Sequence, residues 1–450
     1  MTSAPNHQQP LSGSSPFIWI FILILFTGCA IFGPATSKKD AKSNDSSTEE
    51  IIEKRSGVVD TIKWTYTPEE DVAPIESRAK EIKSEIKSSY NVVLVAPFAA
   101  RNFQGASDRF NSRMIRMVEF YAGLKFAWQN YNDGLQINLS VVDSQKDPEF
   151  KENFRNNESI LNADIIIGPY FSDELEKMAD FAKESGKVIL SPWNTGIVTD
   201  NNPYYIQLRP SLKTHAEALT KYVRSHHQRE EVLLICKDDD RDSVTLTYFQ
   251  HANEKYARGD TFTPFEELKI DDISDPDLSE KLLLMIEEEG LRTFIIPNWS
   301  DQPFVIAALA KINFAKADKD VTVFGLPQWM TMSKMDYNYY ENLNVHVSSA
   351  TPLKFDSEAA KSLKQSFFTK YGVLPGEEAY YGLDVMRLVS NLLKESGTLV
   401  TKGLGKANVG SSYEFDFISV FGEDGESISH HENRHVQIVK FENFRFVHTD

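Results

Sequence analysis

Residues 163–182 read ADIIIGPYFSDELEKMADFA, and this stretch decides the fold. Its start, residues 163–168, is apolar and rich in isoleucine, which predicts a short strand buried on both faces of a parallel sheet. Its second half has apolar residues at helical spacing, which predicts a helix over residues 173–184 with Ser172 as the N-cap. The stretch therefore predicts one strand–helix unit of a doubly wound α/β sheet.

The same alternation extends to both sides of this unit. Upstream, residues 92–98 and 137–142 predict strands, and residues 114–131 predict the helix between them. The remaining predicted strands are residues 188–191, 232–236, 265–270, 293–297, 321–326 and 345–349, and the last forty residues are rich in strand-like segments around a turn at 422–425. The remaining predicted helices are residues 147–162, 212–224, 243–258, 278–289, 303–312, 356–371 and 378–394. Strands that alternate with helices in this way predict an α/β protein with two doubly wound parallel-sheet lobes in tandem.

The composition limits the classes of function. The chain has 450 residues, which suggests two or three domains, and 41% of them are apolar, as in a globular protein. Its net charge of −17 argues against nucleic-acid partners, because such proteins need a basic face to neutralise phosphates. The two cysteines, Cys29 and Cys236, exclude a disulfide framework, and no cysteine–histidine cluster has the spacing of a zinc site.

The start of the chain resembles the export signal of a bacterial lipoprotein. Residues 17–26, FIWIFILILF, are an apolar run only about 15 Å long as a helix, half of a bilayer core. Two small residues then precede Cys29, as in a lipobox. The resemblance implies a signal peptide at residues 1–28 and acyl chains such as palmitate on Cys29. The alternative is an uncleaved membrane anchor that extends through residues 30–32, and both interpretations place the rest of the chain outside the cytoplasm.

Seven segments, taken in order along the chain, carry a resemblance to a known family. They are NVVLVAPFAA at 91–100, VEFYAGLKFAWQNYN at 118–132, the stretch at 163–182, KVILSPWNT at 187–195, YYIQLRPS at 204–211, VLLICKDDDRDS at 232–243 and FTKYGVLPGEEAYYGLDVMRL at 368–388. The ordered set resembles the type I periplasmic binding-protein fold. It is similar to the branched-chain amino-acid (leucine-binding) receptors of ABC transporters, here in a lipoprotein form.

The resemblance implies two lobes joined by several hinge crossovers. Lobe one would consist of residues 90–209 plus 347–400, and lobe two of residues 210–346 plus 401–450. A polar tether and spacer over residues 29–89 would precede them.

The carboxyl ends of the predicted strands give the candidate ligand site, because open α/β sheets bind ligands there. The candidate ligand-binding residues are Tyr170, Phe171, Ser172, Ser191, Trp193, Asn194, Thr195, Asn298, Gln328 and Trp329. In similar receptors the lobe-one loops hold the carboxylate and ammonium of the ligand, and Ser172, Ser191 and Thr195 stand at matching places. Lobe two of these receptors supplies an acidic group for the ammonium, where this chain has the neutral Gln328. Asp301 is the alternative acid.

Each candidate residue also has a structural interpretation. The Gly168–Pro169 pair is typical of a turn, and Ser172 is typical of a helix cap. The tryptophans of these loops, Trp193, Trp299 and Trp329, either stack on an aromatic or sugar-like ligand or fill the space between the lobes.

The remaining clusters predict no catalytic chemistry. Residues 238–242, DDDRD, lack the Gly and Glu of a calcium loop and predict a solvated strand-to-helix loop. Residues 430–435, HHENRH, match no standard metal-site spacing and predict a surface turn. Cys236 lies in an apolar strand, as inert thiols do. With no nucleophile elbow, P-loop or dinucleotide motif, the sequence predicts no metal, no cofactor and no enzymatic activity.

Two functions remain open at this point. The first is a lipid-anchored solute-binding protein of the cell envelope that closes two lobes on a small polar ligand, such as an amino acid, for import or sensing. The alternative is a non-enzymatic partner of envelope proteins, because lipoproteins that activate penicillin-binding proteins in cell-wall synthesis look similar. The loops after the strands favour the first function. A cleft plugged by Trp193 and Trp329, or an exposed apolar patch, would favour the second.

Overall fold

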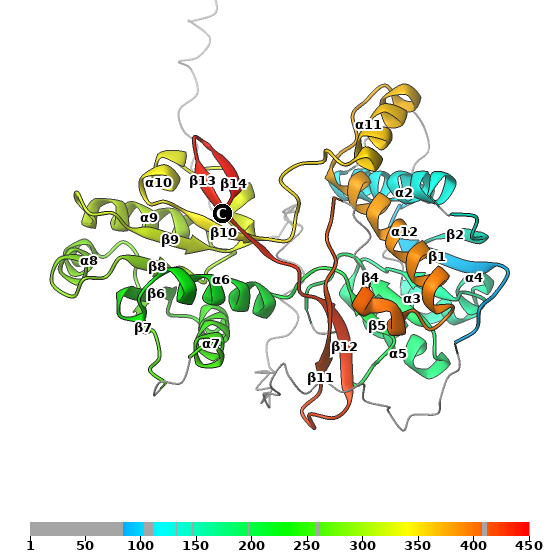
Figure 1. The fold of residues 1–450 in the computed structure, drawn as a ribbon, viewed down its shortest axis with the longest axis horizontal. Coiled ribbons are helices and arrows are strands. Elements are labelled where there is room, and N and C mark those ends of the chain that lie inside the picture. The colour runs from blue at the N-terminus through cyan, green and yellow to red at the C-terminus, as the bar shows by residue number, and fades with distance from the viewer. Residues whose placement is uncertain are drawn as a thin grey trace, which may run out of the picture. The chain divides into compact units, whose positions relative to one another are not determined.

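The computed structural model describes residues 84–102, 111–131, 133–145, 148–196, 198–257, 262–406 and 412–449. Within them the chain forms two seven-stranded sheets, each packed between helices (Figure 1), which confirms the predicted fold of two doubly wound lobes. The predicted signal peptide, Cys29 and residues 29–83 of the predicted tether lie outside the described residues. None of the described helices is long and apolar enough to cross a membrane.

Lobe one is built on the first sheet. Its strand order is β11 (Phe417–Phe421), β12 (Ile428–Asn433), β5 (Tyr205–Gln207), β4 (Val188–Ser191), β3 (Ile165–Ile167), β1 (Tyr90–Ala96) and β2 (Ile137–Asp143). All neighbours are parallel except the hairpin of β11 and β12. One face packs against α2 (Ser112–Asn130), α11 (Glu358–Tyr371) and α12 (Glu377–Ser396), and the other against α4 (Glu158–Leu161) and α5 (Ser172–Ser185). The shorter helices are η1 (Ala100–Asn102), α3 (Pro148–Asn153), η2 (Phe154–Asn156) and η5 (Val400–Lys406).

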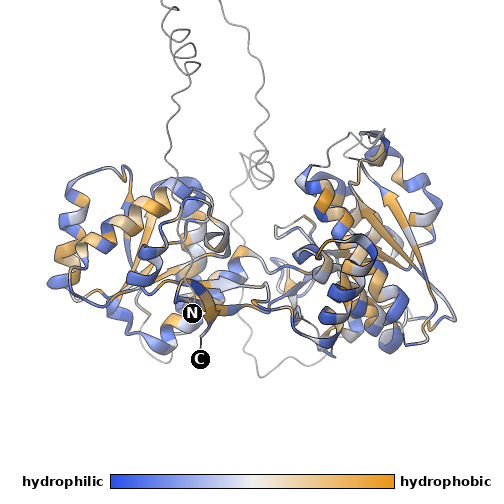
Figure 2. Cartoon of the chain, turned by 90° about the horizontal axis from the view of Figure 1, so that it is seen from above, coloured by the Kyte–Doolittle hydropathy of each residue, from blue (hydrophilic) through white to orange (hydrophobic). Residues whose placement is uncertain are grey.

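Lobe two is built on the second sheet. Its strand order is β14 (Arg445–His448), β13 (Gln437–Glu442), β10 (His346–Ser349), β9 (Thr322–Gly325), β8 (Thr293–Ile295), β6 (Val232–Lys237) and β7 (Glu266–Ile270). One face packs against α6 (Leu212–His226) and α7 (Asp240–Lys255), and the other against α8 (Asp277–Glu287), α9 (Gln302–Ala315) and α10 (Tyr337–Asn342). Two short helices, η3 (Arg229–Glu231) and η4 (Pro327–Thr331), complete it. Figure 2 shows the apolar residues gathered on the strands, as buried parallel sheets require.

The end of the chain divides between the two sheets, in contrast to the prediction that residues 401–450 join lobe two. β12 pairs in parallel with β5, through His431 opposite Ile206, so the hairpin of β11 and β12 extends the first sheet. Only β13 and β14 join the second sheet, where β13 pairs with β10. The sequence shows strand-like segments here, but an alternating pattern does not say which sheet edge a hairpin joins.

Two local predictions also differ from the structure. The helix predicted over residues 147–162 is broken, because Asn157 has extended backbone angles and its side chain accepts hydrogen bonds from the backbone of Ser159 and Ile160, which starts α4. Residues 430–435 were expected in a surface turn, but residues 430–433 lie in β12 and are buried. β5 was not predicted as a strand, since it has only three residues.

α2 and α12 pack with their backbones in contact, and glycines on both helices allow this close approach. A Cβ atom on Gly123 would lie 1.7 Å from the carbonyl oxygen of Ala379, and one on Gly382 would lie 2.0 Å from that of Phe120. The two helices run in the same direction, since Glu119 lies against Gly376 near their starts and Lys394 reaches Asp133 near their ends. The first turn of α12 therefore lies beside the middle of α2, around Glu119 and Gly123.

The chain enters the described part at the opposite end of α12. The hydroxyl of Ser84 donates a hydrogen bond to the carbonyl oxygen of Ser396. The backbone N–H of Thr398 donates a 3.0 Å hydrogen bond to the carbonyl oxygen of Glu85. The backbone N–H of Glu85 donates a 3.1 Å hydrogen bond to the Thr398 hydroxyl. Residues that were expected in a spacer are thus attached to the end of α12.

Candidate ligand-binding site

The loop after β3 shapes the carboxyl edge of the first sheet. Gly168 has a φ of +93°, and a Cβ atom there would lie 2.2 Å from the carbonyl oxygen of Val95 at the end of β1. Only glycine fits such a backbone and such a close approach. The loop therefore crosses the end of β1 and delivers Tyr170 and Phe171 to the start of α5.

Aromatic rings from three elements meet at this edge. The Trp193 ring, in the loop after β4, lies 4.7 Å from the Phe120 ring of α2 and 5.6 Å from the Tyr170 ring, measured between centroids. Phe171 packs edge-on against Tyr170 at 5.2 Å. Phe120 is buried, whereas Tyr170, Phe171 and Trp193 are half-buried. The half-buried rings leave apolar surface that a ligand could cover.

Two arginines of α2 contact the aromatic residues at this edge. The Arg113 guanidinium lies 5.1 Å from the Phe171 ring centroid and 5.9 Å from that of Tyr170. The Arg116 Nη2 atom donates a 3.3 Å hydrogen bond to the Tyr170 hydroxyl. The Nε atom of each arginine is buried and has no hydrogen-bond partner among the described residues. Sequence reasoning missed both residues, because a charge on an amphipathic helix normally indicates a solvated face.

A buried carboxylate from α12 completes this group. Trp193 Nε1 donates to Glu378 Oε2 over 3.4 Å. Burial raises the pKa of Glu378, and the positive charges of Arg209 and Arg116 offset part of this rise. Arg209 itself lies 4.2 Å from the Tyr381 ring centroid and donates to the Thr351 hydroxyl over 3.4 Å. Charged groups from α2, α12 and the end of β5 therefore act on one another at this edge.

The predicted hydroxyl and amide groups of lobe one differ in accessibility. Ser172 is half-buried and is the first residue of α5, whose N-cap is Phe171, so the predicted capping role of Ser172 is wrong. Ser191 is buried at the end of β4, and Thr195 is exposed. Asn194 is buried, and its Oδ1 atom accepts a 2.7 Å hydrogen bond from the backbone of Gly196. Among the predicted serine and threonine residues, Ser172 and Thr195 are thus the accessible ones.

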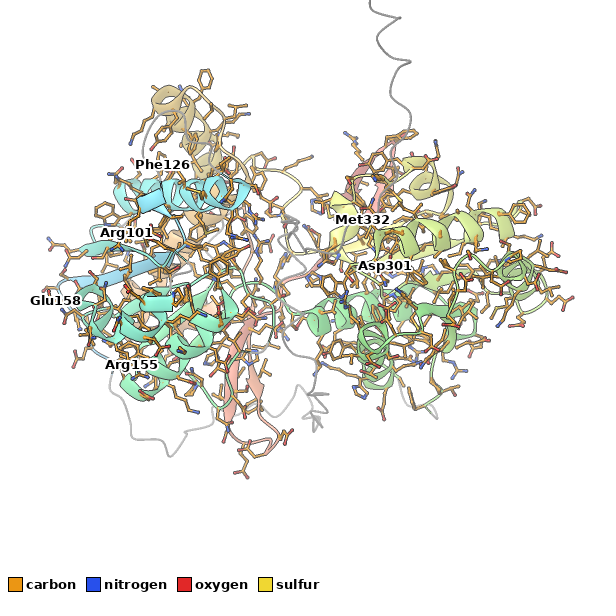
Figure 3. All side chains as sticks on the ribbon, turned by 180° about the vertical axis from the view of Figure 1, so that it is seen from behind. Arg101, Phe126, Arg155, Glu158, Asp301 and Met332 are labelled. Carbon is orange, nitrogen blue, oxygen red and sulfur yellow. The ribbon has the colours of Figure 1, made fainter. Side chains whose placement is uncertain are left out.

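In lobe two, the side chain of Asn298 forms its hydrogen bonds within the lobe. It is buried, and its Nδ2 atom donates 3.0 Å hydrogen bonds to both carboxylate oxygens of Asp242. Its Oδ1 atom accepts from the backbone of Asp301. Asp301 in turn forms a 2.9 Å ion pair with Lys237 and caps α9, so the alternative acid for a ligand ammonium is engaged as well (Figure 3).

Trp329 also packs inside lobe two. It is 1% exposed, its Nε1 atom donates to the carbonyl oxygen of Asn298 over 2.9 Å, and its own carbonyl oxygen accepts from the Tyr340 hydroxyl. Its ring lies over Gly325, where a Cβ atom would come within 2.4 Å. Gln328 is half-buried, and its Oε1 atom has no hydrogen-bond partner among the described residues. Of these two neighbours, only Gln328 remains available to a ligand.

The other clusters considered from the sequence, the acidic loop before α7 and Cys236, are explained by the fold. Asp239 caps α7, and the buried Asp242 accepts from the backbone of Lys237, so this strand-to-helix loop is ordered by its own acids. Burial raises the pKa of the Cys236 thiol to about 12. Among the residues that the structure describes, no group of three or more His, Cys, Asp or Glu side chains could hold a metal ion.

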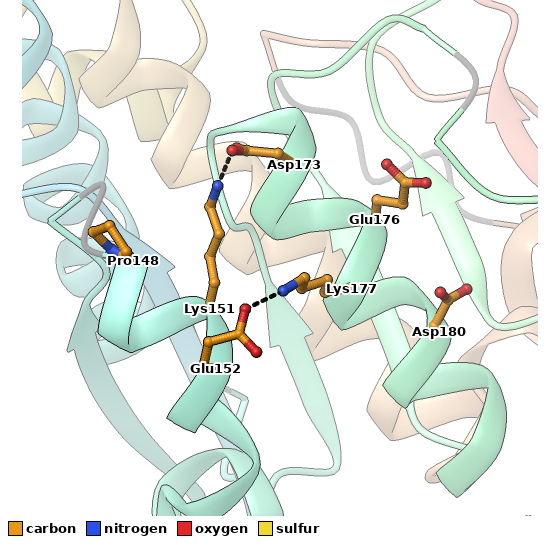
Figure 4. Close-up of a pocket in the computed structure, with 7 residues that line it drawn as sticks. All are labelled: Pro148, Lys151, Glu152, Asp173, Glu176, Lys177 and Asp180. Carbon is orange, nitrogen blue, oxygen red and sulfur yellow. Dashed lines mark hydrogen bonds and ion pairs between the residues drawn. The ribbon is translucent and has the colours of Figure 1, made fainter.

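A surface groove of about 520 Å³ lies between α3 and α5 (Figure 4). It is lined by Pro148, Lys151, Glu152, Asp173, Glu176, Lys177 and Asp180. Lys151 pairs with Asp173 and Lys177 pairs with Glu152, so its charges are largely satisfied across the groove. The group at the carboxyl edge is the stronger candidate.

Comparison with known proteins identifies the family. The model of the periplasmic binding protein family matches residues 118–442. The chain belongs to this family. The family is one of substrate-binding proteins, and it indicates an extracytoplasmic location. No protein with a curated description matches the sequence.

Solved structures of this family share the fold. An ABC transporter substrate-binding protein from Desulfitobacterium hafniense, solved in complex with Leu, is 19% identical with a TM-score of 0.52, over 80% of this chain and 100% of that one. A branched-chain amino acid ABC transporter periplasmic ligand-binding protein from Burkholderia xenovorans is 9% identical with a TM-score of 0.54, over 81% of this chain and 95% of that one. The predicted resemblance to periplasmic binding proteins is therefore confirmed.

Proposed function

We propose that the protein is a lipid-anchored, extracytoplasmic solute receptor that closes its two lobes on a small ligand for import or sensing. The observation that carries this proposal is the group of half-buried rings and arginine side chains at the carboxyl edge of lobe one. The members come from α2, α12 and two loops, and open α/β sheets bind ligands at this edge. The complex of the Desulfitobacterium hafniense protein with Leu supports a ligand of small size.

The ligand contacts that we propose follow the accessible side chains. In lobe one they are Tyr170, Phe171, Ser172, Trp193 and Thr195, joined by Arg113 and Arg116. In lobe two the available side chain of the predicted set is Gln328. Ser191, Asn194, Asn298 and Trp329 would support these residues from behind, because they are buried.

Closure would take place about the crossovers between the lobes. The chain crosses after β5, after β10 and after β12. The Gln437 side chain donates to the carbonyl oxygen of Thr351 over 2.7 Å, and Asn433 Nδ2 donates to that of Leu208 over 3.1 Å. These hydrogen bonds hold the crossovers together, so closure would need only small backbone changes next to them. A ligand that contacts both lobes would select the closed state.

The anchor in this proposal is acylated Cys29. The support is the lipobox-like sequence before it and the extracytoplasmic location of the family. A tether of this kind would keep the receptor at a bacterial membrane, facing the periplasm or the outside.

A thermal-shift screen of the full-length protein in mild detergent tests the receptor function. The library would contain amino acids, organic acids, nucleosides, sugars and muropeptides. A ligand at about 100 times its Kd adds about 2.7 kcal/mol to the free energy of unfolding, so we expect one chemical class to raise Tm by several degrees. The rise should disappear in Trp193→Ala. A folded protein whose Tm no compound changes would count against a solute receptor.

A second candidate function has its own observation. The outer face of α11 and the following turn expose Phe368, Tyr371, Val373 and Leu374, which are 56%, 50%, 57% and 59% accessible. Exposed apolar side chains that lie together favour a protein-interaction surface. An envelope partner such as a penicillin-binding protein would fit this function. A photo-crosslink from position 368 to such a partner in cells, lost in Leu374→Asp, would establish it.

A further inference from the structure

The carboxylates near the candidate site are already engaged. Asp301 pairs with Lys237, and Asp242 accepts from Asn298. Glu377 accepts from the Tyr413 hydroxyl over 3.0 Å, and Glu378 accepts from Trp193 beside two guanidinium groups. A ligand ammonium would have to compete with these partners for a counter-charge, and Gln328 cannot provide one.

The N–H donors of the arginines at the same edge outnumber the acceptors that the described residues give them. A guanidinium has five N–H donors. Between them, Arg113 and Arg116 make one hydrogen bond to the described residues, from Arg116 to the Tyr170 hydroxyl. Both Nε atoms are buried without a partner among those residues, which is costly unless a bound group satisfies them. Arg113 lies over the rings of Tyr170 and Phe171, and Arg116 is bonded to the Tyr170 hydroxyl, with Glu378 as the acid that acts on its charge.

Arginine donors with few acceptors, next to carboxylates that are already bonded, indicate a ligand that brings a negative charge and no positive one. Resting on the proposed receptor function, we propose that the protein binds a small organic carboxylate that lacks an ammonium group and has an apolar body. Its carboxylate accepts from Arg113 and Arg116, since guanidinium groups bind carboxylates in a bidentate manner. Its apolar body lies on the half-buried rings of Tyr170, Phe171 and Trp193.

Matched compounds test this class directly. The set holds 4-methylpentanoate, its amino acid leucine and its amide 4-methylpentanamide, together with 3-phenylpropanoate, phenylalanine and 3-phenylpropanamide. Binding to the full-length protein in detergent is measured by calorimetry. We expect a carboxylate of the set to bind at least about tenfold more tightly than its amino acid, and the amide to show no binding.

Variants then assign the binding to the arginines. Arg116→Gln should weaken carboxylate binding at least about tenfold, and Arg116→Lys should restore part of it, because it keeps the charge but not the paired donors. Arg155→Gln is the matched control, since Arg155 lies in the same lobe and pairs with Glu184 away from this edge (Figure 3). It should bind as the wild type does.

The other outcomes separate this inference from the receptor function. Tighter binding of leucine or phenylalanine than of its carboxylate would overturn the ligand class and leave the receptor function standing. Equal binding of amide and carboxylate, or an Arg116→Gln variant that binds normally, would also overturn it. The ligand class would also be overturned if the thermal-shift screen found a ligand of another class and no carboxylate bound. No binding in either experiment would overturn both.

Discussion

The indole Nε1 atom of Trp193 lies 3.4 Å from Oε2 of Glu378, so the loop after β4 is joined to the first turn of α12. The contact brings together residues that are 185 positions apart. It also gives a buried carboxylate one of its few donors, next to the rings that form the candidate site. The protonation of Glu378 should therefore affect the stability of this edge.

We expect Glu378→Gln to become more stable relative to wild type as pH rises. Burial raises the pKa of Glu378, so the folded protein holds this proton more tightly than the unfolded chain. The contribution of Glu378 to stability then falls as pH rises from about 4.3, the unfolded value, through the folded pKa. Tm of both proteins between pH 4 and pH 8 measures this difference. A difference in Tm that does not change over this range would contradict the prediction.

Glu432 should show the opposite dependence. Burial by itself raises the pKa of Glu432, but the nearby His430 and hydrogen bonds from the Thr214 hydroxyl and the backbone of Ser211 lower it overall. Its stabilising contribution is present above the unfolded pKa and is lost as pH falls through the folded pKa. Glu432→Gln should lose about 2 kcal/mol of stability at pH 7. The loss of Tm relative to wild type should shrink below pH 4, and an unchanged loss would show that ionisation is not the cause.

Gly382→Ala should destabilise the protein, although Ala favours helices over Gly by about 1 kcal/mol. A Cβ atom at Gly382 would lie 2.0 Å from the carbonyl oxygen of Phe120, so α2 and α12 would have to separate. We expect a loss of at least about 2 kcal/mol, seen as a lower Tm. Gly405→Ala is the control, because a Cβ atom there meets nothing within 4 Å. Equal Tm values for the two variants would refute the close packing.

Asn298→Ala should act on stability, whereas Thr195→Ala should not. Without the Asn298 amide, the buried carboxylate of Asp242 loses both hydrogen bonds from its side-chain donor, which costs about 2–3 kcal/mol. Thr195 is exposed, and its truncation should change stability by less than about 0.5 kcal/mol. Thermal unfolding without ligand compares the two variants. If Asn298→Ala kept the wild-type Tm, its role as an internal support would be wrong.

Counting thiols tests the lipid anchor. Cys236 is buried and its pKa is raised to about 12, so it should not react with Ellman's reagent in the folded protein. In guanidinium chloride, protein purified from membranes should show one reactive thiol, because the sulfur of Cys29 is acylated in our proposal. Cys236→Ala should then show none. A second thiol in the unfolded wild type would mean that Cys29 is free.

The sequence predicted the fold well where strands are continuous apolar runs, as in residues 165–167 and 232–236. It missed β5, which is short, and it could not assign the hairpin of β11 and β12 to lobe one. Strand pairing at a sheet edge depends on long-range contacts, such as that of His431 with Ile206, which leave no local pattern.

The candidate site was predicted in part, for physical reasons. Residues on the loops after β3 and β4 were found because strand ends can be located from hydrophobic runs. Arg116 and Glu378 were missed, because a charged residue in a helical pattern looks the same whether it faces solvent or a ligand. Trp329 was placed in the site from its position in a loop, but Gly325 leaves room for its ring to turn inward.

The hydrogen bonds of Ser84 and Glu85 to residues 396 and 398 attach the start of the described chain to lobe one. α12 has 20 residues and is therefore about 30 Å long, with Glu378 at one end and this junction at the other. In the proposed anchored receptor, a pull from the membrane would therefore act on the far end of the helix, away from the arginines and rings.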